Sequence, residues 1–252
     1  MKKLGIIGLG WLGSHIAKTL SNQYEIFATT TSESKIDELK SKGYHITLID
    51  FSDETDTSIQ PWNILPELEA VIITIPFSGI RGAQISMKER QNNLIRFLNN
   101  YNGQMFLMSS TGVYPQTDQD FSEDDKPADE VESEQFILEQ FPQTNILRLA
   151  GLMGDQRLLK NYNISNLNQP VNHIHYADIC KVVEKMLHNH SQSQVYNLTA
   201  PLHPSKEAVI NTQKGLPYSG EEFPKGRTIS TEKLISELGY EYQYPDPRYF
   251  HL

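Results

Sequence analysis

The sequence predicts an α/β fold with a doubly wound parallel sheet, and three observations support that prediction. Short apolar runs alternate with segments whose apolar residues recur at helical spacing. The run at 70–75 is apolar at nearly every position, as in a strand buried on both faces. A glycine-rich turn joins the first apolar run to the first helical segment. Strands that alternate with helices in this way form a parallel sheet through right-handed crossovers.

The elements follow one another along the first 150 residues. We expect strands at 4–7, 24–29, 44–50, 70–75, 104–108 and 145–149, and helices at 11–20, around 36–39, at about 82–101 and near 130–140. Leu12, Ile16 and Leu20 supply the apolar face of the first helix. Gly43 can adopt the positive φ that ends a helix, and Pro76 ends the strand before it.

The glycine-rich turn has the sequence G-L-G-W-L-G, from Gly8 to Gly13. Gly8 permits the tight turn, Gly10 lets the backbone approach a pyrophosphate, and Gly13 lets the helix pack closely on the strand. The helix begins with Trp11 and Leu12, and its N-terminus carries partial positive charge. We predict that these five residues bind a dinucleotide in a Rossmann-type doubly wound parallel sheet.

The end of the second strand bears on the choice of cofactor. Thr30, Thr31 and Ser32 offer hydroxyl groups there, and Lys35 offers a positive charge, which suits the 2′-phosphate of NADP. Glu33 lies about where an acid that holds the ribose of NAD is expected. We therefore predict NADP as the preferred cofactor, with NAD as the alternative.

Two further strand ends complete the predicted cofactor site, because ligands lie outside the carboxyl ends of the strands in such sheets. Asp50 and Phe51 end the third strand and are expected to meet the edge and face of the adenine. Thr74, Ile75 and Pro76 end the fourth strand and are expected to line the same site.

Beyond Leu149 the helical and strand patterns loosen into segments rich in Asn, Pro and Gly, with helices expected at 176–188, 206–213 and 231–238. We therefore predict an NAD(P)-binding domain at 1–150. A small substrate-binding lobe, partly interleaved with that core, is expected at 151–252.

Four motifs in order resemble those of the extended and atypical short-chain dehydrogenases/reductases, the NAD-dependent epimerase/dehydratase group. Besides the glycine turn they are S-S-T-G-V-Y-P at 109–115, I-L-R-L-A-G-L-M-G at 146–154 and N-H-I-H-Y-A-D-I at 172–179. The segment I-S-T-E-K-L-I-S-E-L-G-Y at 229–240 is also similar to the closing helix of that family.

The resemblance implies a catalytic hydroxyl at Ser110, but the usual partner of that hydroxyl is missing. In typical members a Tyr and a Lys of a Y-x-x-x-K motif follow, and their positions fall here on Lys126 and Glu130. The segment 115–141 contains no tyrosine. The pattern therefore matches the atypical branch of the family.

A replacement set of site residues remains. The candidate acid/base residues are Ser110, Thr111, Tyr114 and His175, and Arg148 is the candidate substrate clamp.

His173 and His175 have a spacing that could suit a metal, but a fuller ligand set is missing, so we predict no metal.

Composition excludes several classes of partner. The net charge of −9 argues against nucleic acid and anionic membranes, and no segment has the length of a membrane span. The single cysteine, Cys180, fits a reducing compartment. We expect a cytoplasmic protein whose partner is a small-molecule substrate.

Two functions stay open from the sequence. The first is an NAD(P)-binding, epimerase/dehydratase-like oxidoreductase that acts on a small carbonyl or sugar-nucleotide substrate. The second is a catalytically silent NAD(P)-binding sensor or partner-binding protein. The glycine turn also resembles that of the β-hydroxyacid dehydrogenases. That family should continue into a long all-helical domain, which the Pro-, Asn- and Gly-rich second half does not resemble.

Overall fold

The structure is a computed structural model that describes residues 1–52, 59–76, 86–125, 132–220 and 223–252. The chain divides into two compact units. Unit 1 comprises Met1–Ser109, Glu132–Ile146 and Leu187–Gln194, and unit 2 comprises Ser110–Val131, Leu147–Met186 and Val195–Leu252. The assignment of a nucleotide-binding role to 1–150 and a substrate-binding role to 151–252 remains a prediction.

The central sheet has seven described strands in the order β10-β7-β5-β4-β1-β2-β3. Their bounds are β1 Lys2–Ile7, β2 Tyr24–Thr30, β3 His45–Leu48, β4 Leu68–Ile73, β5 Gln104–Ser110, β7 Thr144–Leu149 and β10 Val195–Leu198. Strand β1 pairs in parallel with β2 and β4, β2 pairs in parallel with β3, and β4 pairs in parallel with β5. The predicted Rossmann-type parallel sheet is confirmed.

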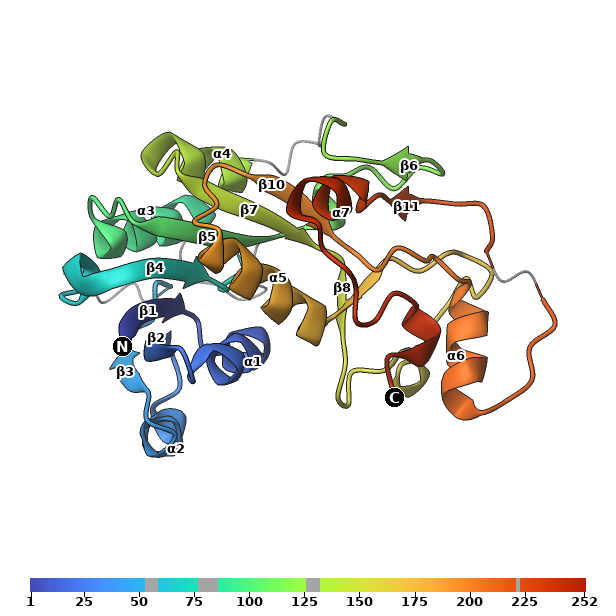
Figure 1. Ribbon diagram of the computed structural model, residues 1–252, viewed down its shortest axis with the longest axis horizontal. Helices are drawn as coiled ribbons and strands as arrows, with labels where there is room; N and C mark the ends of the chain where they lie inside the picture. Colours follow the sequence, from blue (N-terminus) through green and yellow to red (C-terminus); the bar gives the residue numbers. More distant parts are fainter. Residues whose placement is uncertain (53–58, 77–85, 126–131, 221–222) are drawn as a thin grey trace. The chain divides into compact units, whose positions relative to one another are not determined.

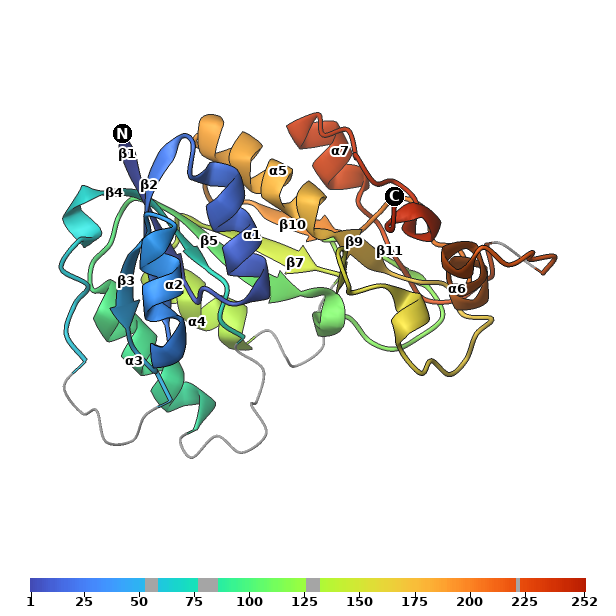
Figure 2. The same ribbon diagram turned by 90° about the horizontal axis from the view of Figure 1, so that it is seen from below.

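Helices cover both faces of the sheet within unit 1. They are α1 Trp11–Leu20, α2 Ile36–Ser41, α3 Met87–Leu98 and α4 Glu132–Gln140. Helices α1 and α2 lie on one face, and α3 and α4 lie on the opposite face (Figures 1 and 2). This arrangement is why β1 and β4 are buried on both sides: Leu4, Ile6 and the run from Ala70 to Ile73 are 0% exposed.

Several elements begin or end where local chemistry requires it. Helix α1 has the predicted bounds, and β4 ends at Ile73, before Thr74 and Ile75. Helix α3 begins at Met87 because Ser86 forms a capping box with Glu89: the Ser86 hydroxyl accepts from the Glu89 amide, and the Glu89 carboxylate accepts from the Ser86 amide. The predicted residues 82–85 of this helix lie outside the described residues.

Unit 2 carries short elements beside its helices. Its helices include α5 Tyr176–His188, whose last two residues belong to unit 1, α6 Lys206–Lys214 and α7 Glu232–Leu238. Strand β6 Asp120–Phe121 pairs with β11 Thr228–Ile229, and β8 Gly151–Met153 pairs with β9 His173–His175. Among the described residues, no helix combines the length and hydropathy that crossing a membrane requires.

Asp178 ties the start of α5 to the C-terminal segment of unit 2. Its side chain is 0% exposed. The carboxylate accepts hydrogen bonds from the Tyr240 hydroxyl (2.8 Å) and from the backbone amides of Gln243 (2.8 Å) and Tyr244 (3.1 Å). A buried carboxylate with three donors is satisfied, and its removal strands those donors.

Asp178→Ala is expected to lower the free energy of unfolding by about 3 kcal/mol, because three buried donors lose their acceptor. Asp178→Asn keeps one acceptor oxygen, so its free energy of unfolding should fall by about half as much. Urea denaturation measures both variants, with the exposed Asp37→Ala of α2 as control. If Asp178→Ala and the control unfold at the same urea concentration, the hydrogen bonds of Asp178 do not contribute to the free energy of unfolding.

Candidate functional site

The turn between β1 and α1 is built on backbone contacts that glycine permits. Gly8 has φ +99°, a conformation that other residues rarely adopt. A Cβ on Gly13 would lie 2.4 Å from the Gly8 carbonyl oxygen, so the helix packs on the turn backbone to backbone. A Cβ on Gly10 would meet no atom within 4 Å. The turn is therefore tightly packed where Gly13 meets Gly8, whereas Gly10 has free space where a side chain would lie.

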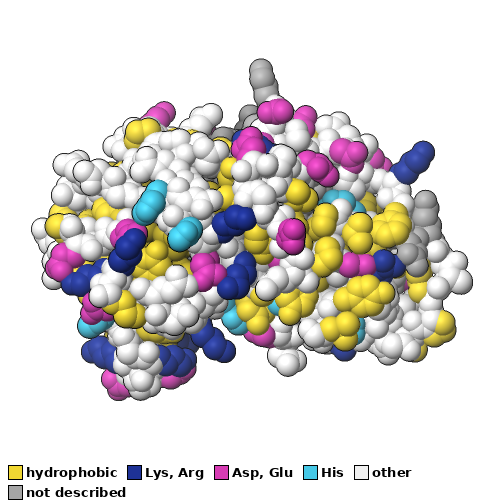
Figure 3. Space-filling view, in the orientation of Figure 1, with side chains coloured by type: hydrophobic (Ala, Val, Ile, Leu, Met, Phe, Trp, Pro, Cys, Tyr) yellow, Lys and Arg dark blue, Asp and Glu magenta, His cyan; other side chains and the backbone are white. Residues whose placement is uncertain are grey.

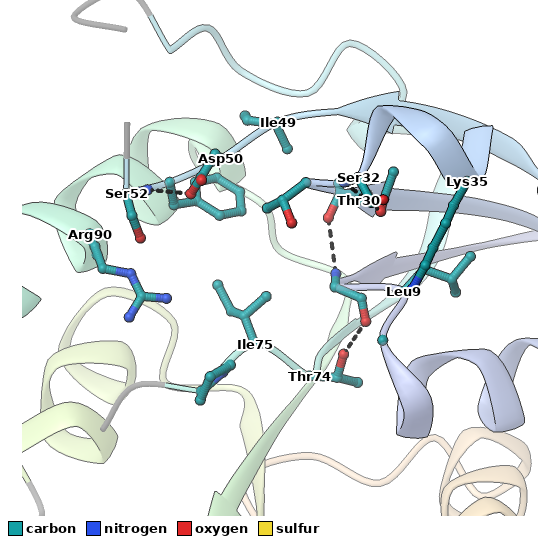
Figure 4. Close-up of a pocket in the computed structure, with 16 residues that line it drawn as sticks. Leu9, Thr30, Ser32, Lys35, Ile49, Asp50, Ser52, Thr74, Ile75 and Arg90 are labelled. Carbon is teal, nitrogen blue, oxygen red and sulfur yellow. Dashed lines mark hydrogen bonds between the residues drawn. The ribbon is translucent and has the colours of Figure 1, made fainter. Parts of the chain in front are cut away.

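Neighbouring strand ends hold this turn in place. The Gly8 amide donates to the Thr29 hydroxyl (2.9 Å), and the Leu9 amide donates to the Thr29 carbonyl (2.8 Å). The Thr74 hydroxyl donates to the Gly8 carbonyl. Residues at the carboxyl ends of β2 and β4 therefore fix the glycine turn, as the dashed lines in Figure 4 mark.

The N-terminus of α1 is not neutralised by its own residues. Gly10 is the N-cap and provides no side-chain hydrogen bond, and the first turn contains no acidic residue. The amide groups of a first turn and the helix dipole then favour an anion. This is the geometry that a pyrophosphate requires.

A cavity of about 620 Å³ in unit 1 opens over this turn (Figure 4). Ten of the thirteen predicted cofactor residues line it: Gly8, Gly10, Thr30, Thr31, Ser32, Asp50, Phe51, Thr74, Ile75 and Pro76. Trp11, Leu12 and Gly13 do not line it, since they lie in the first turn of α1. The structure thus brings three separate strand ends together around the glycine turn.

One end of the cavity is rich in hydroxyl groups and carries a cation. The Thr30 hydroxyl accepts from the Ser32 amide (3.2 Å), and the Ser32 and Ser34 hydroxyls are 3.1 Å apart. Lys35 lines the cavity at this end (Figure 4). Basic side chains also gather over α2 in Figure 3, where Lys40 and Lys42 are exposed.

The other end of the cavity carries an acid and an arginine. The Asp50 carboxylate accepts from the Ser52 amide (2.8 Å). Phe51 is only 4% exposed, and its ring packs edge-on against that of Phe97. Arg90 of α3 also lines this end. Sequence reasoning missed Arg90, because a basic residue on an amphipathic helix has no local signal that distinguishes it from a surface residue.

The predicted catalytic residues after β5 belong to unit 2 and have different surroundings. Ser110 is exposed, and its hydroxyl accepts from the Gly112 amide (3.0 Å). Tyr114 is 1% exposed: its hydroxyl donates to the Asn197 side-chain oxygen (2.9 Å) and accepts from the Arg148 guanidinium (2.8 Å). Burial raises the pKa of the Tyr114 hydroxyl, and Arg148 partly offsets that rise.

His175 is enclosed by aromatic rings. Its side chain is 4% exposed, and its ring stacks on that of Tyr244 at a centroid distance of 3.8 Å. The Nδ1 atom accepts from the Ala177 amide (3.2 Å). Tyr176 and Phe250 also contact the ring.

Unit 2 has a cavity of its own, of about 640 Å³, with a strongly polar lining. Among the described residues, three cations, Lys206, Lys225 and Arg227, line it together with one acid, Asp118. Of the four predicted catalytic residues, Thr111 lines this cavity. A basic cavity in a chain of net charge −9 favours an anionic ligand.

His173 lines the same cavity, and the sequence analysis did not select it as an acid/base residue. Burial, with a smaller contribution from the charge of Lys206, lowers the pKa of His173 to about 4. A Cβ on Gly151 would lie 2.6 Å from the imidazole, so glycine at that position makes room for the ring. The imidazole is therefore neutral at physiological pH.

Ser109 and Glu134 form a second contact that the sequence analysis did not predict. Glu134 is 2% exposed, and the Ser109 hydroxyl donates to its carboxylate at 2.5 Å. Both residues belong to unit 1, so the contact joins the end of β5 to α4.

Lys126 and Glu130, which occupy the positions of the missing Y-x-x-x-K motif, lie outside the described residues. In the described part of the chain, no three His, Cys, Asp or Glu side chains group as metal ligands would.

Comparison with known proteins identifies similar folds. Residues 4–76, which span β1 to the end of β4, match the model of the TrkA-N domain. The sequence is 28% identical to Protein YeeZ of Escherichia coli over 272 aligned positions, which cover 98% of each chain.

Two similar solved structures carry nucleotide ligands. MoeE5 in complex with UDP-glucose and NAD is 15% identical, with a TM-score of 0.73 over 98% of this chain and 96% of that one. UDP-glucuronic acid 4-epimerase of Bacillus cereus, in complex with UDP-glucuronic acid and NAD, is 14% identical, with a TM-score of 0.73 over 97% and 95%. The chain has the fold of these proteins. The predicted resemblance to the epimerase/dehydratase group is thereby confirmed for the fold.

Gly10→Ala tests the open side of the glycine turn. The added methyl group contacts no protein atom, so the melting temperature should stay within about 1 °C of the wild type. The methyl group would occupy the space of the pyrophosphate, and the affinity for NAD or NADP should fall at least about tenfold. Calorimetric titration and thermal melting measure the two effects. An unchanged affinity would contradict pyrophosphate binding at this turn.

His173→Gln tests the lowered pKa of this partly exposed imidazole by its effect on stability. The folded pKa of about 4 lies below the unfolded value of about 6.5, so the unfolded chain binds the extra proton between these values. The wild type should therefore lose stability as the pH falls from about 6.5 to 4. His173→Gln should lose less over that range, whereas the exposed His188→Gln should behave like the wild type. Parallel curves for all three proteins would refute a lowered pKa at His173.

Proposed function

We propose that this chain is an NAD(P)-dependent, epimerase/dehydratase-like oxidoreductase that acts on a small carbonyl or sugar-nucleotide substrate. One observation carries the proposal: the unit 1 cavity, which is lined by the glycine turn up to Gly10, the N-cap of α1, and by the ends of β2, β3 and β4. The similar structures of MoeE5 and of the Bacillus cereus epimerase hold NAD and a UDP-sugar, which supports the same ligand classes here.

The cofactor fits the residues of this cavity. The open side of Gly10 and the first-turn amides of α1 would hold the pyrophosphate, and the hydroxyl groups after β2 would hold the adenosine ribose. Bound nicotinamide would supply hydride transfer to or from the substrate carbon. We propose NADP as the preferred form, because Lys35, Thr31 and Ser32 line the end where a 2′-phosphate would lie.

We propose that the substrate binds in the unit 2 cavity through an anionic group. Lys206 and Lys225 line that cavity and supply ammonium groups. The Arg227 guanidinium donates to the carbonyls of Thr111 (2.7 Å) and Pro115 (2.9 Å), which holds the segment after β5 over the cavity. Sugar nucleotides and sugar acids both carry the required negative charge.

The solvent exposure of the four candidate acid/base residues differs, and we assign their roles accordingly. We assign proton transfer to Ser110 and Thr111, because Ser110 is exposed and Thr111 borders the unit 2 cavity. Tyr114 and His175 are enclosed, and we assign them positioning roles. Arg148, predicted as a substrate clamp, would act through its hydrogen bond to Tyr114.

The second candidate function is a catalytically silent NAD(P)-binding sensor or partner-binding protein. The observation that favours it is the missing Y-x-x-x-K motif, since the segment 115–141 contains no tyrosine. In both cases we propose a cytoplasmic protein that does not bind nucleic acid, in keeping with the net charge of −9 and the single buried Cys180.

Two measurements, nucleotide binding and substrate turnover, distinguish the oxidoreductase from the catalytically silent NAD(P)-binding protein. Calorimetry with NAD and NADP tests binding, and the oxidation of NADH or NADPH with a panel of carbonyl compounds and UDP-sugars tests catalysis. An oxidoreductase should bind at micromolar concentrations and turn over, and Ser110→Ala should lower turnover without weakening binding. Binding without turnover would favour the sensor, and no binding of either nucleotide would reject both functions.

Lys35→Glu tests the preference for NADP. Reversal of the charge at the hydroxyl-rich end of the cavity should weaken NADP binding about tenfold more than NAD binding, since only NADP carries the 2′-phosphate. Lys40→Glu on α2 is a control, because Lys40 is exposed and does not line the cavity. Equal losses of affinity for the two nucleotides in Lys35→Glu would remove the basis for the preference.

A further inference from the structure

The unit 2 cavity combines an excess of positive charge with a lining that is otherwise polar and uncharged. Lys206, Lys225 and Arg227 are its cations. Asp118 is the one acid of the described lining, so cations exceed acids by two charges. His173 adds no charge, because burial lowers the pKa of its imidazole to about 4. The cavity therefore favours a ligand that carries about two negative charges.

Lys206 is held at the cavity by contacts that leave its charge uncompensated. It is the first residue of α6, and its backbone amide donates to the Gln169 carbonyl (2.9 Å). Its ammonium group donates to the Gln169 side-chain oxygen (3.1 Å). In the part of the chain that the structure describes, no carboxylate forms an ion pair with Lys206. An amide partner orients the ammonium group without neutralising it, so the charge can act on a bound anion.

Arg227 is fixed in a similar way, through both its side chain and its backbone. The guanidinium donates to the carbonyls of Thr111 (2.7 Å) and Pro115 (2.9 Å). The Asn172 side-chain amide donates to the Arg227 carbonyl (2.9 Å), and the Asn172 side-chain oxygen accepts from the Ile229 amide (2.9 Å). These partners are neutral, so a second oriented cation contributes its charge to the cavity.

The rest of the lining suits hydroxyl groups better than a nucleobase. The exposed side chains of Gln116, Asn166 and Asn168 line the cavity. A side-chain amide both donates and accepts hydrogen bonds, as a sugar hydroxyl does. No Phe, Tyr or Trp is found among the described lining residues, so a uracil ring would lack the side chains on which bases most often stack.

The charge of the cavity also distinguishes between acidic groups. A phosphate monoester carries close to two negative charges at neutral pH, whereas a carboxylate carries one. We propose that the unit 2 cavity binds a phosphorylated monosaccharide that is not attached to a nucleotide. Lys206, Lys225 and Arg227 attract the phosphate, and the amide side chains bind the sugar hydroxyls. This inference rests on the proposed oxidoreductase function and narrows its substrate to sugar phosphates.

The experiment is calorimetric titration of the wild type with six probes. Three are sugar phosphates: glucose 6-phosphate, fructose 6-phosphate and ribose 5-phosphate. The others are inorganic phosphate, UDP-glucose and gluconate, which separate the phosphate, the nucleotide and the carboxylate. The tightest of the three sugar phosphates should bind at least about tenfold more tightly than each of the other three probes.

Lys206→Gln and Lys225→Gln test the cations of the cavity. Each variant should bind the same sugar phosphate at least about tenfold more weakly, because it removes one positive charge. Neither side chain is buried, so both melting temperatures should stay within about 2 °C of the wild type. Lys214→Gln is the matched control: Lys214 lies in the last turn of the same helix as Lys206, is exposed and does not line the cavity. This control should bind like the wild type.

Four outcomes would overturn the inference. Tighter binding of UDP-glucose than of every sugar phosphate would make the substrate a sugar nucleotide, and tighter binding of gluconate would make it a sugar acid. Inorganic phosphate that binds as tightly as the sugar phosphates would leave the sugar without a role. Absence of sugar-phosphate binding, or wild-type binding by both Lys206→Gln and Lys225→Gln, would remove the cavity as the site. Each is distinct from failure of the proposed function, in which the wild type binds neither NAD nor NADP.

Discussion

The close approach of α1 to β1 is the constraint on which the candidate cofactor site depends. The Gly13 backbone packs against the Gly8 carbonyl at a distance that leaves no room for a Cβ, and Gly8 takes a left-handed φ to make the turn. The start of α1 is thereby aimed at the cavity with its first-turn amides free of a side-chain cap. Thr29 and Thr74, from the flanking strands, hold the turn by hydrogen bonds.

The chain is acidic overall, but cations outnumber acids among the described residues that line each of the two cavities. The net charge is −9, yet the described residues that line the unit 1 cavity include two cations, Lys35 and Arg90, beside one acid, Asp50. In the part of the chain that the structure describes, three cations and one acid line the unit 2 cavity. Cations placed in concave sites attract anionic ligands more strongly than the same charges spread over a surface, so each cavity is suited to a phosphorylated or acidic small molecule.

The sequence predicted the structural features whose signal is local, and it missed those that depend on long-range contacts. The glycine turn and the strand ends at Asp50 and Thr74 follow from short motifs and from the rule that ligands lie at the carboxyl ends of strands. Arg90 and His173 could not be found in this way, since burial and a cavity wall are properties of tertiary packing. Strand β10 was missed because V-Y-N-L is short and interrupted by a polar residue that is buried through its contact with Tyr114.

A crystal structure of the protein with NADP bound tests the central claim most directly, because it locates the nucleotide without assuming any activity. The account predicts the pyrophosphate over Gly8 to Gly10, the 2′-phosphate beside Lys35 and the adenine beside Asp50 and Phe51. Clear density for the nucleotide anywhere outside the unit 1 cavity, or with its adenosine in the reverse direction, would contradict the account.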